Sequence, residues 1–453
     1  MKNKLFGYLG LVLLHLVLGL VIFYEPLVAM VYAVVLVFGG IYYVLKTGNR
    51  NHEVLLIAAY IVGTEVFLRM TGGNPIHEMA KYLVIAFMLI GIFYKSFSPK
   101  GLVYLFFLLL LLPGVIIGLQ ELSPESNPRK VIAFNMSGPV ALVMAALYCF
   151  DKTISSATLY KLLIAIGMPI ISMTVYLILY NPDVQSVIVN AASNFDTSGG
   201  FGPNQVSTAL GLGMFVFFTL FLLYSKSKVI LFLNLGLVGI MTFRGIVTFS
   251  RGGVFTAIVA IVLLVIVVSF YLSIKGKFKL VIVVGGSIFI SLSIWSYTLI
   301  QTNGFIENRY ANKDSQGREK KDRLGGREAI SKQELQIFWD NPISGAGVGK
   351  SKDLRAEQTG KVAAAHNEVT RLLAEHGIFG LLGLLLLAVV PLLHYYHNRQ
   401  HLLLLSFYFF WALTINHAAM RIAAPGFIYA LTLLKINWGT KSEEKKGVQP
   451  IKK

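Results

Sequence analysis

The feature that most constrains this chain is a succession of continuous apolar runs, each about twenty residues long. Runs of this length without alternation predict helices rather than the strands of a membrane barrel. Because hydrocarbon offers no hydrogen-bond partners, a backbone that crosses it must satisfy its own polar groups, as a helix does. With 55% hydrophobic and 14% charged residues, the chain is expected to be an all-α, polytopic membrane helix bundle of about 12–14 transmembrane helices.

The apolar runs also place the individual spans to within a few residues. We expect spans near 5–24, 27–45, 53–70, 79–95, 101–119, 130–150, 158–180, 205–224, 228–248, 253–273, 279–300, 368–394, 401–418 and 424–437. Lysine and arginine gather in short cytoplasmic loops, and every second connection in this chain carries them, for example at Lys46 and Lys277. Both termini are therefore predicted to be cytoplasmic, with two long outer loops at 181–204 and 301–367.

This pattern divides the chain into four parts. Residues 1–300 hold eleven transmembrane helices and the outer loop 181–204, and residues 301–367 form a second, partly helical outer loop. Residues 368–437 hold the C-terminal transmembrane helices, of which the last run is short enough to be tilted or re-entrant, and residues 438–453 form a cytoplasmic tail.

The second outer loop contains a predicted amphipathic helix over 326–340, which ends before Asn341-Pro342. Apolar residues recur there at helical spacing. They are Ile330, Leu335, Ile337, Phe338 and Trp339. A long loop with structure of its own is typical of a functional segment.

Composition excludes several classes of function. The net charge of +18 is spread mostly over short loops, where it orients a membrane protein, so membrane lipids and not nucleic acid are the expected contacts. The single cysteine, Cys149, forms no internal disulfide and is interpreted as a small packing residue. No metal-ligand spacing and no nucleotide-binding loop occurs, so neither a metal nor a cofactor is expected.

Several reactive side chains converge on the predicted outer face although they are far apart in the sequence. Arg251 follows Ser250 and precedes two glycines at the edge of an apolar span, where an ionisable residue is costly and marks a candidate site. Its planar guanidinium suits phosphate oxygens; the alternative is an arginine that reaches ordinary lipid headgroups. Arg244 and Asn204 lie at neighbouring outer ends and are candidates for the same site.

A second group of candidates surrounds the end of the long loop. His366 can accept a proton near neutral pH, and Asn367 can cap the helix that follows. Glu368 or Glu375 can orient the histidine. The alternative interpretation of His366 is a histidine that only lies at the polar rim where a helix begins. Arg421 lies at another outer mouth and adds positive charge to this face.

One charged pair lies inside a predicted span. Glu65 and Arg69 are four residues apart with the acid first, so they can pair on one helix face. An intramembrane ion pair is a candidate functional site. A structural pair that satisfies itself is the simpler interpretation.

Three blocks in the second half of the chain recur together in one known family. Gly326-Arg327 begins the amphipathic helix, and Pro342-Ile343-Ser344-Gly345-Ala346-Gly347 is a Pro-x-x-Gly-x-Gly turn. His366-Asn367 is followed by Leu372-Leu373-Ala374-Glu375-His376-Gly377, the most specific part. With Phe201-Gly202-Pro203-Asn204 and Ser250-Arg251-Gly252, the set resembles the O-antigen ligase and O-antigen polymerase superfamily over about residues 200–390.

The resemblance implies a bacterial inner-membrane glycosyltransferase whose site faces the periplasm. It would move a glycan from undecaprenyl pyrophosphate onto lipid A-core or onto a second lipid-linked glycan, without a metal. In that family arginines are thought to hold the pyrophosphate, which implies Arg251 and Arg327 here. Arg244, from its place at the same outer face, is a third candidate for this contact. A histidine is thought to assist the acceptor hydroxyl, which implies His366. By their place at the same outer face, Asn204, Asn367 and Arg421 are expected to be further substrate contacts.

Several alternatives stay open at this point. Ligase, polymerase and protein O-oligosaccharyltransferase differ only in the acceptor. A transporter or flippase of lipid-linked oligosaccharide is the competing class, although it should carry its charges near the bilayer midplane in repeated halves. The chain departs from the family pattern in two ways that bear on the subtype. A tryptophan often follows the Gly-Arg sooner, whereas Trp339 comes twelve residues after it. The predicted number of spans also exceeds the number common among ligases.

Overall fold

The computed structural model describes residues 2–188, 190–193, 195–319, 327–359, 365, 367–418 and 420–439. The α-helices in that part are α1 (Lys2–Tyr24), α2 (Leu27–Thr47), α3 (Glu53–Met70), α4 (Met79–Lys95), α5 (Val103–Glu121), α6 (Pro128–Cys149), α7 (Ser156–Tyr180), α8 (Pro203–Thr219), α9 (Lys228–Val247), α10 (Arg251–Phe270), α11 (Ile274–Gln301), α12 (Phe305–Tyr310), α13 (Arg327–Asp340), α14 (Lys350–Thr359), α15 (Glu368–His397), α16 (Leu404–His417) and α17 (Ala424–Leu431). Short turns of other helix types are η1 (Pro99–Leu102), η2 (Pro124–Ser126), η3 (Gln185–Val187), η4 (Asp196–Ser198) and η5 (Leu220–Tyr224), and the strands are β1 (Thr153–Ser155) and β2 (Lys435–Asn437).

Ten of the described helices are long and apolar enough to cross a membrane. The chain is therefore an all-α, polytopic membrane protein, as its sequence predicts. The count is lower than fourteen because α3, α4, α16 and α17 are too short or too charged to qualify. The prediction of a span over 424–437 corresponds to α17 and β2, and eight residues of helix reach only about 12 Å against a hydrocarbon layer of about 30 Å. That segment does not cross by itself.

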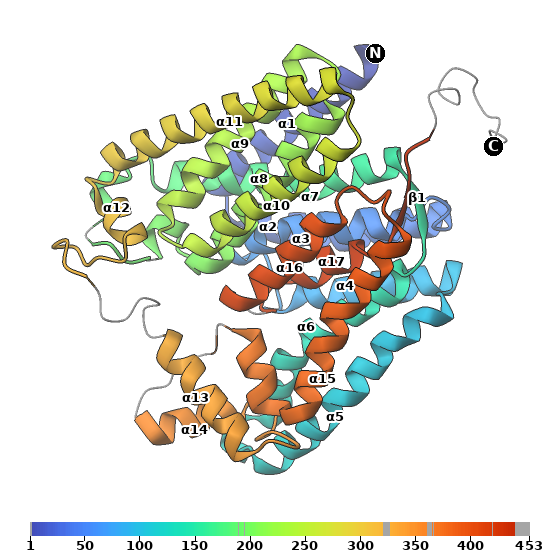
Figure 1. The fold of residues 1–453 in the computed structure, drawn as a ribbon, viewed down its shortest axis with the longest axis vertical. Helices are drawn as coiled ribbons and strands as arrows, with labels where there is room; N and C mark the ends of the chain where they lie inside the picture. The colour runs from blue at the N-terminus through green and yellow to red at the C-terminus, as the bar shows by residue number, and fades with distance from the viewer. Residues whose placement is uncertain are drawn as a thin grey trace.

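The described helices of the long loop lie on the opposite side of the protein from β1 (Figure 1). Helices α12, α13 and α14 lie on the left of that view, and β1 lies on the right. β1 pairs in parallel with β2, and Asp151 forms a 2.6 Å ion pair with Lys435, so the segments after α6 and α17 are tied together. The predicted topology requires this separation; the assignment of the two faces to cytoplasm and periplasm stays a prediction.

The core of the bundle depends on close helix contacts, which glycine permits. Helices α3 and α7 pack so closely that a Cβ added to Gly63 would lie 2.3 Å from the carbonyl oxygen of Ile166. Between α8 and α10, a Cβ added to Gly253 would lie 2.0 Å from the carbonyl oxygen of Ser207. Small residues bring helix backbones together in membranes, where apolar side chains gain little by leaving lipid.

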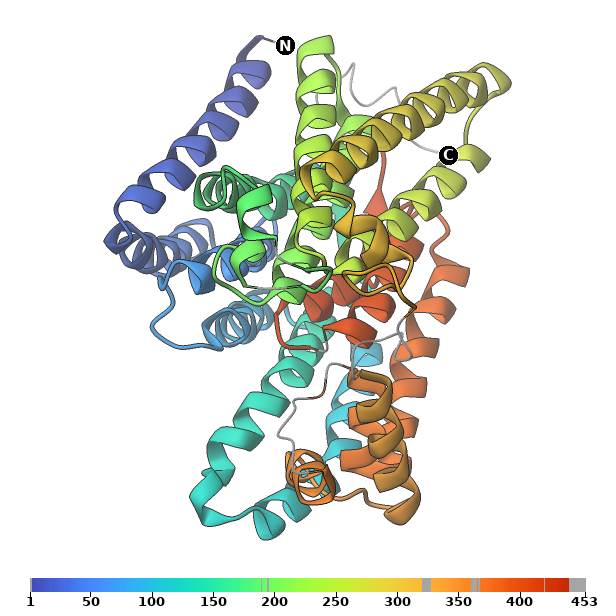
Figure 2. The same ribbon diagram turned by 90° about the vertical axis from the view of Figure 1, so that its left-hand side faces the viewer.

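Helix α15 is broken near its first third, and this break positions the candidate site. Gly377 has φ 59° and ψ −137°, which is not helical, and an added Cβ would lie 2.5 Å from the carbonyl oxygen of Ile343. The turn over 341–349 therefore packs directly against the break. Figure 2 shows α5, α6 and the segment α13–α15 gathered at one end of the molecule.

Candidate active site

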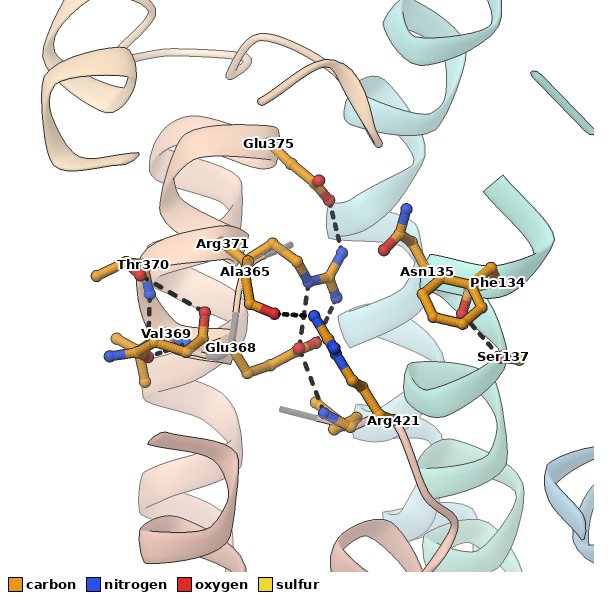
Figure 3. Close-up of polar contacts among 12 residues, drawn as sticks. Phe134, Asn135, Ser137, Ala365, Glu368, Val369, Thr370, Arg371, Glu375 and Arg421 are labelled. Carbon is orange, nitrogen blue, oxygen red and sulfur yellow. Dashed lines mark hydrogen bonds and ion pairs between the residues drawn. The ribbon is translucent and has the colours of Figure 1, made fainter. Parts of the chain in front are cut away.

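The first turns of α15 carry a buried triad of charged side chains. Asn367 starts the helix by accepting hydrogen bonds of 2.9 and 3.4 Å from the backbone N–H groups two and three residues on. Glu368, Arg371 and Glu375 then share one face of the helix because they are three and four residues apart. Arg371 Nε lies 3.1 Å from Glu368 Oε2, and its Nη1 lies 2.6 Å from Glu375 Oε2 (Figure 3). One guanidinium thus joins two carboxylates.

Glu375 also holds the glycine turn that precedes α14. Its Oε1 accepts a 3.0 Å hydrogen bond from the backbone N–H of Gly349 and a 3.2 Å bond from Ser351 Oγ. A Cβ on Gly345 would lie 2.3 Å from the carbonyl carbon of Glu375, so the turn requires glycine there. Both carboxylate oxygens of Glu375 are therefore occupied, one by Arg371 and one by the turn.

A second buried ion pair fastens the loop helices to α15. Arg355 Nη1 on α14 lies 2.7 Å from Glu334 Oε1 on α13, and Thr370 Oγ1 donates a 2.6 Å hydrogen bond to Glu334 Oε2. Burial raises the pKa of Glu334, and the hydrogen bond from Thr370 and the charge of Arg355 oppose that change. The helices of the long loop are thereby held on the start of α15.

The predicted apolar face of α13 is only partly correct. Ile337 is buried and packs with Ala346 and Ala374. Trp339 is 70% exposed and Leu335 is 38% exposed, so neither contributes to this contact. The buried side of α13 includes Glu334 instead, because its charge is matched by Arg355, an interaction that hydrophobic periodicity does not detect.

A cavity of about 990 Å³ opens beside the triad of α15. Its polar and charged lining comprises His77, Glu78, Ser126, Lys130, Asn135, Ser351, Lys352, Arg355, Glu368, Arg371, Glu375 and Arg421. Its apolar lining includes Ile76, Tyr82, Val131, Phe134 and Met420. The carboxylates of this lining already face cations, whereas within the described residues no ion pair engages Lys130 or Lys352. An anionic group that enters the cavity would therefore meet positive charge.

Arg421 reaches this cavity from the connection between α16 and α17. Its Nη2 donates a hydrogen bond to the carbonyl oxygen of Ala365, and both residues line the cavity (Figure 3). Ala365 directly precedes His366, the predicted base. His366 and residues 320–326 lie outside the described residues, so the structure places only the neighbours of the histidine, Ala365 and Asn367.

Arg244, predicted to contact pyrophosphate, is buried against the end of α7. Its Nη2 donates a 2.8 Å hydrogen bond to the carbonyl oxygen of Leu177, and its Nη1 donates a 3.3 Å bond to that of Asn181. The last carbonyl groups of a helix lack partners within it, and a cation satisfies them and complements the helix dipole. The contacts of Arg244 are thus those of a helix-capping residue.

Arg251 and Asn204 lie at a second place, away from the cavity lining, where Ser250 connects them. Arg251 begins α10, and its Nη1 donates a 3.2 Å hydrogen bond to the carbonyl oxygen of Arg309. Ser250 Oγ donates a 2.8 Å bond to Asn204 Oδ1. Neither Arg251 nor Asn204 lines the cavity. The predicted residues therefore form two groups, one around Arg251 and one around Arg421. Arg327 begins α13, and the structure describes only its backbone.

The two groups are connected through α16. A Cβ on Gly252 would lie 2.4 Å from the ring of His417, at the end of α16, so the glycine beside Arg251 admits that helix. His417 Nε2 also lies 3.2 Å from Thr208 Oγ1. Arg421 follows His417 by four residues. The start of α10 and the cavity are therefore linked by the last turn of α16 and the connection after it.

Sequence reasoning missed several residues of this site. Arg371 had a usable signal, because it follows Glu368 by three residues and precedes Glu375 by four, the spacings at which helical side chains meet. Lys130 and Lys352 had none, since a lysine at the end of a span or in a polar loop is ordinarily a solvated charge. In the described part of the chain, no group of three or more His, Cys, Asp and Glu could hold a metal ion.

The fold and this charged cavity define a polytopic membrane protein with a polar site at one face of its helix bundle. Residues 211–385 match the family model described as O-antigen ligase, which confirms the resemblance to the O-antigen ligase and polymerase superfamily over that stretch. The matched stretch includes Arg251 and the triad of α15 and ends before Arg421. The match indicates a membrane glycosyltransferase of the O-antigen ligase type. No curated protein matches the chain.

Proposed function

We propose that this protein transfers a glycan from undecaprenyl pyrophosphate to the hydroxyl group of an acceptor glycan at the periplasmic face of a bacterial inner membrane. The observation that carries the proposal is the cavity beside α15. Its wall is formed partly by Ala365 and the triad of α15, from the family-matched segment, and partly by Arg421 and Lys130, from outside that segment. A polar cavity with a basic lining suits a glycan whose leaving group is a pyrophosphate.

The proposed reaction is a single displacement. The acceptor hydroxyl oxygen bonds to the anomeric carbon of the donor sugar while the bond from that carbon to the phosphate oxygen breaks. His366 takes the hydroxyl proton. Arg251, which lies outside the cavity lining and is connected to it through the last turn of α16, and Arg327 stabilise the charge that develops on the departing lipid pyrophosphate. Attack from the opposite side inverts the anomeric centre. The roles of these three residues rest on the family resemblance.

The contacts of the two carboxylates favour positioning roles for them. Glu368 and Glu375 share the guanidinium of Arg371, and Glu375 also binds the glycine turn. The oxygens of both carboxylates are thus occupied by Arg371 and by backbone N–H groups of other segments. We propose that both hold the segment around His366 in place, and that Arg421 contributes positive charge to the cavity.

The acceptor and the metal requirement are settled by one reconstitution. The purified protein in phospholipid vesicles is given an undecaprenyl-pyrophosphate glycan with either lipid A-core or only a second copy of the donor. Ligation to lipid A-core identifies a ligase, and growth of the lipid-linked glycan identifies a polymerase. Activity should survive EDTA, because arginines replace the cation at the pyrophosphate. Uptake of the donor into the vesicles without a new glycosidic bond would instead identify a transporter.

A further inference from the structure

Residues 420–423, in the connection between α16 and α17, are held from several sides by charged residues far away in the sequence. From α3, Glu65 Oε1 pairs with Arg69 at 2.6 Å, and its Oε2 accepts a 2.7 Å hydrogen bond from the backbone N–H of Ala423. The simpler interpretation of this spacing, in which the Glu65–Arg69 pair satisfies itself, therefore does not hold. The pair binds the backbone of another segment.

A second contact comes from α4. Lys81 Nζ donates a 3.4 Å hydrogen bond to the carbonyl oxygen of Met420, and the same ammonium pairs with Glu78. Arg69 Nη2 lies 3.8 Å from Glu78 Oε2, so this pair joins the pair of Glu65 in one network of two acids and two cations. All four side chains are buried.

The opposite side of the connection is held by α15 and α6. The backbone N–H of Met420 donates a 3.4 Å hydrogen bond to Glu368 Oε2, whose carboxylate also binds Arg371. On α6, a Cβ at Gly138 would lie 2.7 Å from the carbonyl oxygen of Met420, so only glycine allows this approach. Two charged networks, one on α3 and α4 and one on α15, therefore meet on the backbone beside Arg421.

These contacts determine where Arg421 lies. Buried backbone groups outside a helix need partners, and unpaired ones are costly inside a membrane protein. The N–H groups of residues 420 and 423 and the carbonyl group of residue 420 find those partners in Glu368, Glu65 and Lys81. Arg421, held between them, points to Ala365 and the cavity. A shift of the connection would move its guanidinium directly.

We propose that Glu65, Arg69, Glu78 and Lys81 are positioning residues that act through Arg421. They hold residues 420–423 so that the guanidinium of Arg421 meets the anionic part of the substrate in the cavity. This inference rests on the proposed function for the role of Arg421. The clamp itself is a separate claim about the connection and has its own measurement.

The test is a double-mutant cycle with Glu65→Gln and Arg421→Ala in the transfer assay. Misplacing a catalytic group by about 1 Å can cost on the order of a hundredfold in rate, so Glu65→Gln should lower kcat by about tenfold or more in the wild-type background. In the Arg421→Ala background the same change should cost less than about twofold, because the group it positions is gone. Glu53→Gln is the matched control, since Glu53 is a buried acid on the same helix whose carboxylate accepts hydrogen bonds from Asn51, near the start of α3.

Two substitutions of Lys81 provide a second test: one removes its contact with the connection, and the other keeps it. Lys81→Met removes the contact with the carbonyl of Met420, whereas Lys81→Arg keeps a cation that can still donate to it, so only the first should lower kcat. Hydrogen exchange followed by mass spectrometry reports the clamp independently of activity. Glu65→Gln and Lys81→Met should raise exchange in residues 420–423, and Glu53→Gln should not.

Each outcome separates the two claims. Equal losses of kcat in both backgrounds would overturn the positioning role and make the network a general stabiliser of the bundle. Unchanged exchange in residues 420–423 would overturn the clamp whatever the activity. An inactive wild-type protein with raised exchange in the two variants would overturn the proposed function and support the clamp.

Discussion

Arg371 Nη1 lies 2.6 Å from Glu375 Oε2, and the same guanidinium binds Glu368 on the other side. All three side chains are buried at the wall of the cavity. Because two acids share one cation here and each acid also binds the backbone of another segment, the triad connects α15 to the glycine turn and to the connection after α16. Its removal should affect folding and activity together.

The triad provides the first prediction. Arg371→Met leaves two buried carboxylates without their cation, and breaking a buried ion pair costs about 3–5 kcal/mol. The variant should have a strongly lowered midpoint of thermal unfolding in detergent, as measured by tryptophan fluorescence. The control is Lys332→Met, which breaks an exposed pair with Glu328 at the same helical spacing; such pairs contribute about 0.3–0.5 kcal/mol. Equal midpoints for the two variants would contradict the account of the triad.

The second prediction concerns the contact between α8 and α10. In Gly253→Ala the new Cβ would lie 2.0 Å from the carbonyl oxygen of Ser207, so one helix must move and the start of α10 with it. Overpacking of this kind costs about 1–3 kcal/mol. Gly286→Ala on α11 is the control, because nothing lies within 4 Å of the added atom. The first variant should lower the unfolding midpoint and the second should not; a stable Gly253→Ala protein would argue against such close packing.

The third prediction separates the two ends of the proposed reaction. Arg251→Lys keeps the charge but loses the planar fork for two phosphate oxygens, so it should retain little transfer activity. Arg251→Ala and His366→Ala should each lower kcat by about a hundredfold or more. Only Arg251→Ala should weaken binding of undecaprenyl pyrophosphate, measured by titration of the purified protein. Equal binding losses in the two alanine variants would make His366 a structural residue of the helix rim.

The fourth prediction is a pH dependence away from the site, at the start of α3. Burial, followed by the positive charges of Lys95 and Lys152, lowers the pKa of His52 to about 4. The unfolded histidine titrates near 6.5, so the folded protein disfavours the charged form. The stability associated with neutral His52 is fully present above about pH 6.5 and is lost as the pH falls toward 4.

The measurement is the unfolding midpoint between pH 7.5 and pH 4.5 for the wild type and for His52→Gln. Glutamine can still bond the hydroxyl group of Tyr148, which lies 2.9 Å from His52 Nδ1, but it does not titrate. The midpoint of the variant should fall less on acidification. Parallel curves would show that protonation of His52 does not control this part of the acid sensitivity.

The amino-acid sequence by itself determined the class of the fold and the segment that holds the family motif. Long apolar runs have one solution in lipid, the helix, so the all-α membrane bundle followed directly from hydropathy. Helix α13 begins and ends within one residue of its prediction, because its start and stop signals are local. The Glu65–Arg69 pair was also predictable, since a spacing of four places both side chains on one face.

Only the tertiary structure decided which candidates share a site. It separated Arg251 and Asn204 from the cavity, placed Arg244 on the carbonyl groups of α7 and brought Arg421 to Ala365. It also showed that α17 is too short to cross, and that Glu65 binds Ala423 across 358 positions of sequence. Hydropathy and helical spacing report interactions within one turn of a helix. Contacts between buried charges and the backbone of a distant loop depend on how helices pack, and no local pattern encodes that.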